Sequence, residues 1–200
     1  MIPNNLSRDS LIIDSMLRAG VPRSMARPDF SMKAEFNAPG EYLASWGRRA
    51  STFFSEGRVL LLGAERSSDI LIVGRMLYGL ARSLILNRNS CRVVPLPTIL
   101  QLLSGRESDA SMLAELEDMD ALLLPDFYAK GKQPPFSQDA MSKLEGWMFH
   151  QLTRKGQSFI LVCETTNIDQ CSAWWNRWLL AAIRERLSSF ILAGEEFDIR

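Results

Sequence analysis

The feature that most constrains this chain is the alternation of short apolar runs with longer stretches of helical periodicity. The apolar runs, each suited to one buried strand, cover residues 58–63, 91–95, 120–126 and 158–163. The stretches with helical character cover residues 69–86, 97–103, 111–117, 137–154 and 169–188. A last strand is expected at 190–192. This alternation predicts an α/β fold, in which helices cover both faces of a mainly parallel sheet.

The region before the first strand has a different character. Residues 6–18 form an amphipathic stretch that Gly20 and Pro22 end, residues 23–40 are irregular, and residues 41–54 have helical spacing. A chain of 200 residues has room for one domain and a short appendage. We therefore expect an N-terminal extension over residues 1–40 and an α/β domain over residues 41–200.

Composition excludes several classes of protein. The 23 basic and 23 acidic residues cancel, which excludes a strongly electropositive body built for bulk phosphate binding. Three cysteines with no CxxC pair indicate buried reduced thiols, and with a single histidine they predict no metal site. No apolar run approaches the ~20 residues of a membrane helix, and the N-terminus lacks the pattern of a secretion signal. We expect a cytoplasmic protein that does not enter a membrane.

The loop after the first strand stands where a phosphate-binding loop belongs, because ligands of parallel sheets bind beyond the carboxyl ends of the strands. Such a loop needs glycines, a lysine for the outer phosphates and a Ser or Thr for magnesium. The loop in this chain contains, in order, Gly63, Arg66, Ser67, Ser68, Asp69 and Ile70. Asp69 stands where the lysine is needed and Ile70 where the hydroxyl is needed, so a hydrolytic site is not expected.

The next strand end supports the same interpretation. The run 120–126 has Pro125 where a magnesium-binding acid normally closes the strand, and it keeps only the second acid, Asp126. The run 158–163 is followed by Glu164. We predict a degenerate nucleotide site with no catalytic residues and no cofactor.

In the order and spacing of these segments, the chain resembles the helicase-loader and transposition-helper AAA+ ATPases of the DnaC and IstB kind, from about Ala19 to Arg200. The matching segments are residues 19–22, 57–63 before Walker A, 120–126 at Walker B, 156–164 before the sensor position, and 186–200. The resemblance implies a P-loop NTPase-like AAA+ core with a three-layer sandwich. It also implies an arginine, Arg186, that acts across a subunit boundary in a homo- or hetero-oligomer.

The family uses ATP to switch contacts with a replicative helicase and single-stranded DNA, and its N-terminal region contacts the helicase. The resemblance therefore implies that this chain acts in DNA replication as a helicase loader, a loader partner or a regulator, with residues 6–18 as a partner-binding helix. The departures from the Walker motifs imply a pseudo-ATPase that acts by binding. The alternative for residues 6–18 is a helix that docks on its own domain.

Two alternative functions stay open. The chain is an ATPase only in a mixed complex, where Arg66 or a partner supplies the missing groups, or it is a single-stranded nucleic-acid-binding module. The second alternative rests on the segment 174–178, which contains three tryptophans. Trp175, Arg177 and Arg184 would form an aromatic and basic surface for bases or a partner, with Trp175 the exposed ring. Packing of these rings in the core is the opposing interpretation.

Overall fold

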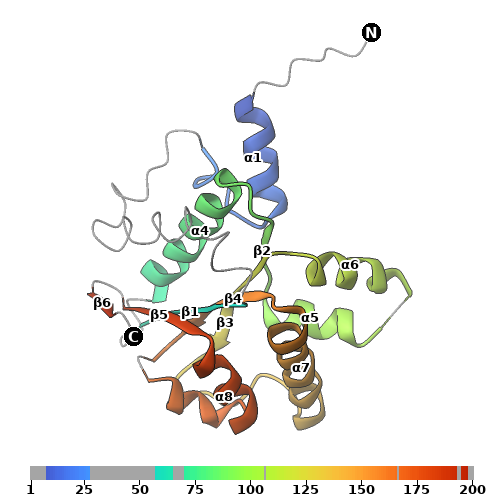
Figure 1. Ribbon diagram of the computed structural model, residues 1–200, viewed down its shortest axis with the longest axis vertical. Helices are drawn as coiled ribbons and strands as arrows, with labels where there is room; N and C mark the ends of the chain where they lie inside the picture. The colour runs from blue at the N-terminus through green and yellow to red at the C-terminus, as the bar shows by residue number, and fades with distance from the viewer. Residues whose placement is uncertain are drawn as a thin grey trace.

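The computed structural model describes residues 8–27, 57–64, 70–105, 107–165, 167–192 and 195–197. Its strands form one six-stranded sheet in the order β2-β3-β4-β1-β5-β6 (Figure 1). The strands are β1 (Val59–Gly63), β2 (Cys91–Val93), β3 (Ala121–Tyr128), β4 (Ser158–Cys163), β5 (Leu187–Leu192) and β6 (Glu195–Phe197). All neighbouring pairs are parallel except β5 and β6. The predicted mainly parallel sheet is confirmed.

Helical segments connect the strands and cover the sheet. They are α1 (Arg8–Arg18), α4 (Ile70–Leu86), α5 (Leu96–Leu103), α6 (Glu107–Glu117), α7 (Gln138–His150), the π-helical turn η1 (Gln151–Lys155), the 3₁₀ segment η2 (Ile168–Ala173) and α8 (Arg177–Glu185). Ser137 caps α7 as expected, because its side chain accepts a hydrogen bond from the Ala140 amide. No helix in the described parts of the chain is long and apolar enough to cross a membrane.

Two apolar cores lie on opposite faces of the sheet, because alternate strand residues point to opposite sides. Leu61 and Leu161 belong to the core under α5, α6, α7 and α8. Leu60 and Ile160 belong to the core under α1 and α4. Figure 1 shows α4 on one side of the sheet and α7 and α8 on the other. The predicted three-layer arrangement is confirmed.

Several predicted elements differ from the structure. The last strand, expected over 190–192, begins at Leu187, and the helix expected over 111–117 begins at Glu107. The helix expected over 169–188 is instead η2, a turn at Trp174 and Trp175, and α8. The Asn176 side chain accepts from the Leu179 amide, so a new helix starts there and the earlier one cannot run through. The strand expected over 120–126 continues to Tyr128. The helix expected over 41–54 lies outside the described residues.

Helix α1 docks on its own domain. Met16 is fully buried in the core that α4 covers. Gly20, with φ at 85°, turns the chain after the helix, and the Ala19 carbonyl accepts a hydrogen bond of 2.9 Å from the Val93 amide. Residues 19–21 therefore cover the outer edge of β2. The contact of α1 with a partner stays a prediction.

Candidate functional site

The topology predicts a ligand crevice beyond the carboxyl ends of β1 and β4, which are neighbours in the sheet. The connection after β1 runs through α4 to one face, and the connection after β4 runs through η2 and α8 to the other face. Strands whose connections leave to opposite faces open a ligand crevice between their ends. The predicted nucleotide site lies beside these two strand ends, and the binding of a nucleotide there stays a prediction.

The end of β1 is held close to β4. Gly63 lies opposite Cys163, and the Ala64 amide donates to the Cys163 carbonyl at 2.9 Å. The loop residues Arg66, Ser67, Ser68 and Asp69 lie outside the described residues. Ile70, the first residue of α4, is half-buried and packs against the core under that helix. Its side chain has no oxygen to offer a metal.

Pro125 interrupts the ladder between β3 and β4. Leu124 lies opposite Leu161 and Tyr128 lies opposite Cys163, so three residues of β3 face Val162 alone. Proline has no amide hydrogen to donate, and within sheets it is confined to edges, strand starts and bulges. Pro125 therefore produces a bulge at the position where a magnesium-binding acid is expected. The bulge changes the direction of the next side chain, that of Asp126.

The Asp126 carboxylate binds the start of α5. Its two oxygens lie 3.0 and 3.3 Å from the Leu96 amide nitrogen. The N-cap residue of α5 is Pro95, which has no side-chain oxygen, so Asp126 supplies the missing cap from β3. Partial burial raises the pKa of the Asp126 carboxyl above its ordinary value of 3.8, while hydrogen bonds from the Leu96 and Asp126 amides lower it.

This contact turns the Asp126 carboxylate toward β2. In the sheet order, β2 and β1 lie on opposite sides of β3, and β4 separates β3 from β1. At a strand spacing near 4.8 Å, β1 is about 10 Å from β3. The Asp126 carboxylate therefore points toward β2, away from β1 and Gly63.

Sequence reasoning missed two polar residues after β4, although the polar run that follows Glu164 was a signal for them. The Thr165 hydroxyl accepts from the Asn167 amide at 3.0 Å and lies 2.8 Å from the Gln170 side-chain oxygen. Asn167 caps η2 by accepting from the Asp169 amide at 2.8 Å. Glu164 is half-buried, and its amide donates to the Tyr128 carbonyl. The side chains of Thr165 and Asn167 are therefore engaged within their own loop.

The two cysteines near the carboxyl ends of the strands are buried, so reagents in solution do not reach their thiols. Cys163 and Cys171 are free and fully buried. Burial, followed by the neighbouring Cys171 side chain, raises the pKa of the Cys163 thiol well above its ordinary value. The Cys163 thiol therefore stays protonated and unreactive. Among the residues described, no group of three or more His, Cys, Asp or Glu side chains is placed to hold a metal.

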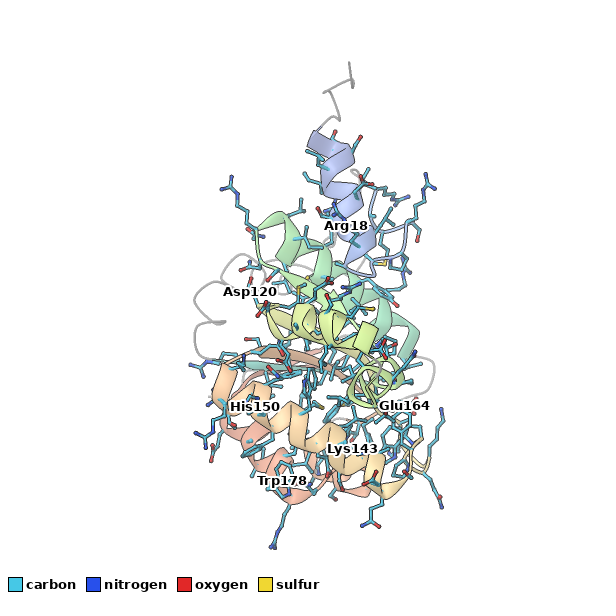
Figure 2. The ribbon with its side chains drawn as sticks, turned by 90° about the vertical axis from the view of Figure 1, so that its right-hand side faces the viewer. Arg18, Asp120, Lys143, His150, Glu164 and Trp178 are labelled. Carbon is cyan, nitrogen blue, oxygen red and sulfur yellow. The ribbon has the colours of Figure 1, made fainter. Side chains whose placement is uncertain are left out.

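The prediction that Trp175 is the exposed ring is wrong. Trp175 is 2% exposed, stacks on Phe127 with ring centroids 4.8 Å apart, and donates from Nε1 to the Phe127 carbonyl at 2.9 Å. It lies in the turn before α8, so helical spacing does not decide its direction. The ring on the surface is Trp178, which is 43% exposed and packs edge-on against Phe149. Figure 2 shows Trp178 on the side of the molecule away from α1.

The three arginines singled out in the sequence have different surroundings. Arg177 is exposed at the start of α8, and Arg184 forms an ion pair with Asp169. Arg186 is half-buried, and its carbonyl accepts from the Val59 amide at the start of β1. Arg186 therefore lies beside the amino-terminal end of β1, whereas Gly63 is at the carboxyl end of that strand. Its action on a neighbouring subunit stays a prediction.

Comparison with known proteins identifies the architecture. No family model and no curated sequence matches the chain. The DnaC helicase loader is similar in structure, with a TM-score of 0.59 at 10% identity over 78% of this chain and 91% of that chain. DnaI gives 0.51 at 14% identity over 76% and 81%. AMPPCP-bound DnaA from Aquifex aeolicus gives 0.56 at 8% identity over 84% of this chain and 50% of that chain.

At these identities the likeness establishes the fold alone. The predicted AAA+-like, P-loop NTPase-like α/β architecture is confirmed. This chain spans about half of the DnaA chain and most of the DnaC chain.

Proposed function

We propose that this protein is a non-hydrolysing AAA+-like protein of DNA replication that acts by binding, as a helicase loader, a loader partner or a regulator. Its fold is that of the DnaC helicase loader and of DnaI, which supports a role in replication. The absence of hydrolysis is supported above all by one observation, the Asp126 carboxylate bound to the Leu96 amide.

The chemistry of the crevice supports this proposal. Hydrolysis of a nucleoside triphosphate needs a lysine for the phosphates, and a hydroxyl and a carboxylate for magnesium. Ile70 packs against the core and has no side-chain oxygen, Pro125 has none either, and Asp126 caps α5. The described residues of the crevice do not fit a magnesium–triphosphate group.

Binding would use surfaces that the domain leaves exposed. Leu11 and Leu17 are exposed on α1, and Phe149 and Trp178 are exposed where α7 meets α8. Exposed apolar side chains that cluster mark protein contacts more often than those that stand alone. A replicative helicase or another AAA+ replication protein is the proposed partner, and the assembly would be a homo- or hetero-oligomer.

Turnover and co-elution test the proposal together. The full chain is mixed with ATP and magnesium, with and without a replicative helicase. We expect no ATP turnover, no magnesium-dependent ATP binding, and co-elution with the helicase in the absence of ATP. Micromolar magnesium-dependent binding with turnover would overturn the proposal. Turnover confined to a mixture with an ATPase subunit, and lost in Arg66→Ala, would favour the mixed-complex alternative.

Contact with single-stranded DNA is a second candidate function. The exposed Trp178 ring, next in sequence to the exposed Arg177, favours it, because bases stack on aromatic rings and arginine pairs with phosphates. Trp178→Ala should weaken salt-dependent binding of a dT oligonucleotide without loss of folded structure. Arg154→Gln, which removes an exposed charge from η1, serves as its control. Equal weakening by both variants would show that the ring has no part in binding.

A further inference from the structure

A cavity of about 510 Å³ lies at the amino-terminal side of the sheet, away from the crevice. It is open to solvent, and it is lined by residues from the C-terminal ends of α1 and α4, the start of β2 and the last part of α6, and by Met119. Figure 2 shows Arg18 and Asp120 well separated from Glu164, which marks the crevice. The cavity is therefore independent of the candidate nucleotide site.

Three arginines line this cavity: Arg18, Arg88 and Arg92. Glu115 is the one carboxylate among the lining residues, so the lining carries a net charge of plus two. Asp120 is not one of the lining residues. Its Oδ2 atom accepts hydrogen bonds of 2.8 Å from the amide and the hydroxyl of the lining residue Ser90. A charge of this size matches a phosphate monoester, which carries about −1.5 to −2 at neutral pH.

The three guanidinium groups are weakly engaged by the protein. Arg92 pairs with Glu115 at 3.4 Å. The Arg92 side chain is partly exposed and that of Glu115 is exposed, and ion pairs in contact with solvent contribute little to stability. Arg18 donates from Nε to the Asp14 carbonyl of its own helix at 3.4 Å. No ion pair or hydrogen bond of the Arg88 side chain is found in the part of the chain that the structure describes.

The helix end beside the cavity does not prevent an anion from binding. Carbonyl groups at a helix C-terminus repel negative charge when they are left free. At the end of α4, the Asn87 side chain donates to the Ser83 carbonyl at 2.7 Å and the Arg88 amide donates to the Ile85 carbonyl at 3.0 Å. The Asn89 amide donates to the Leu84 carbonyl, also at 3.0 Å. These carbonyl groups therefore already have partners.

The other lining residues are of two kinds, and the apolar ones suit an organic body. Ala19, Ile85, Cys91 and Met119 are apolar, and Ser15, Asn89 and Ser90 are polar. Burial, with a smaller contribution from Asp120, raises the pKa of the Cys91 thiol to about 12, so this side chain stays neutral. The volume lies within the range of pockets that hold small organic ligands, about 300–1,000 Å³.

We propose that this cavity, the arginine pocket, binds a phosphate monoester carried on an organic body of nucleotide size. Arginine guanidinium groups fit phosphate oxygens through paired hydrogen bonds, and three arginines line this one pocket. A free mononucleotide and the 5′-phosphate end of a nucleic-acid strand share this chemistry.

Calorimetry on the full chain tests the proposal with AMP, adenosine, and a dT oligonucleotide with and without a 5′-phosphate. We expect AMP or the phosphorylated strand to bind at least about tenfold more tightly than its unphosphorylated counterpart, without magnesium. AMP binding alone identifies a mononucleotide site, and binding of the phosphorylated strand alone identifies a strand-end site. Equal binding of phosphorylated and unphosphorylated probes would overturn the proposal.

Matched variants locate the binding. Arg88→Asn removes the cation and tolerates the positive φ of 65° at this position, and Arg92→Gln removes a second cation. Each should weaken phosphate binding about tenfold. Arg154→Gln removes an equal charge from η1, outside the pocket, and should leave binding unchanged.

Two results would contradict the proposal. If Arg154→Gln weakens phosphate binding as much as the pocket variants do, phosphate is held by the general positive charge of the surface and not by the arginine pocket. If an acidic peptide displaces AMP from the wild type at a lower concentration than AMP itself needs to bind, the pocket prefers a carboxylate partner. Because the test needs neither magnesium nor turnover, its failure leaves the proposed replication function untouched.

Discussion

The two ends of the parallel sheet use their polar groups in opposite ways. At the carboxyl end, Asp126 binds the Leu96 amide and Thr165 binds within its own loop. At the amino end, Arg18, Arg88 and Arg92 line a cavity with weak partners or none in the described structure. Polar side chains that satisfy each other hold loops in place, whereas cations around a cavity remain available to a ligand. Among the described residues, the polar side chains named at the carboxyl end therefore bind within the protein, while those at the amino end face a cavity.

The tryptophans strengthen this contrast, since both rings before α8 hold the carboxyl end together. Trp174 donates to the Lys132 carbonyl at 2.9 Å and packs edge-on against Tyr128. Trp175 stacks on Phe127 and donates to its carbonyl. The bulged end of β3 is therefore fixed from the α8 side as well as from α5.

The largest expected effect comes from removing the ring beside this bulge. Trp175→Ala deletes a fully buried ring and leaves the Phe127 carbonyl without its indole partner. We expect the free energy of unfolding to fall by about 3–5 kcal/mol, measured by urea denaturation. Trp178→Ala, at the exposed ring, should cost less than about 1 kcal/mol. Similar losses in both variants would mean that Trp175 does not anchor the carboxyl end.

The next effect lies at the amino end. Gly20→Ala places a Cβ atom 3.2 Å from the Val93 carbonyl oxygen at a φ of 85°. We expect a loss of about 1–2 kcal/mol, because both the left-handed backbone and the close contact disfavour alanine. Gly146→Ala in α7 meets nothing within 4 Å and should stabilise the protein by about 0.5–1 kcal/mol. Thermal unfolding of the two variants should shift in opposite directions, and a neutral Gly20→Ala would show that α1 docks loosely.

Asp126 gives a smaller effect that separates a structural from a catalytic role. Asp126→Ala removes the cap of α5 and should cost about 1 kcal/mol, while Asp126→Asn keeps an acceptor oxygen and should cost less. Neither variant should change ATP turnover, because we propose that there is none. A turnover that Asp126→Asn abolishes would restore Asp126 to a catalytic role.

The smallest effect is the dependence of stability on pH at the same residue. The pKa of Asp126 is raised in the folded state, so its stabilising contribution is complete below the unfolded value of 3.8 and is lost as the pH rises through the folded value. The stability of the wild type relative to Asp126→Asn should therefore decrease across this window. Urea denaturation of both proteins at a series of pH values measures the difference. An increase with pH would show that the hydrogen bonds at Asp126 outweigh its burial.

Much of the fold could be predicted from local patterns. The positions of the strands from β1 to β4, their parallel arrangement and the Ser137 cap follow from apolar runs and helix-start residues that lie next to each other in the chain. The proline at position 125, where a magnesium-binding acid is expected in nucleotide-binding folds, was also visible in the sequence. Such features depend on neighbours within one helical turn or one strand, so a single sequence carries them.

Tertiary structure decided the direction of each side chain that matters most for function. Trp175 is buried because Phe127, 48 positions earlier, supplies a ring and a carbonyl, which no helical spacing reveals. Asp126 faces α5 because β2 lies beside β3 in the sheet. The arginine pocket exists because the ends of α1 and α4 meet at β2 and bring residues 18, 88 and 92 together. Local periodicity fixes which segments are helices and strands, but contacts between distant segments determine which polar groups are satisfied and which remain free for a ligand.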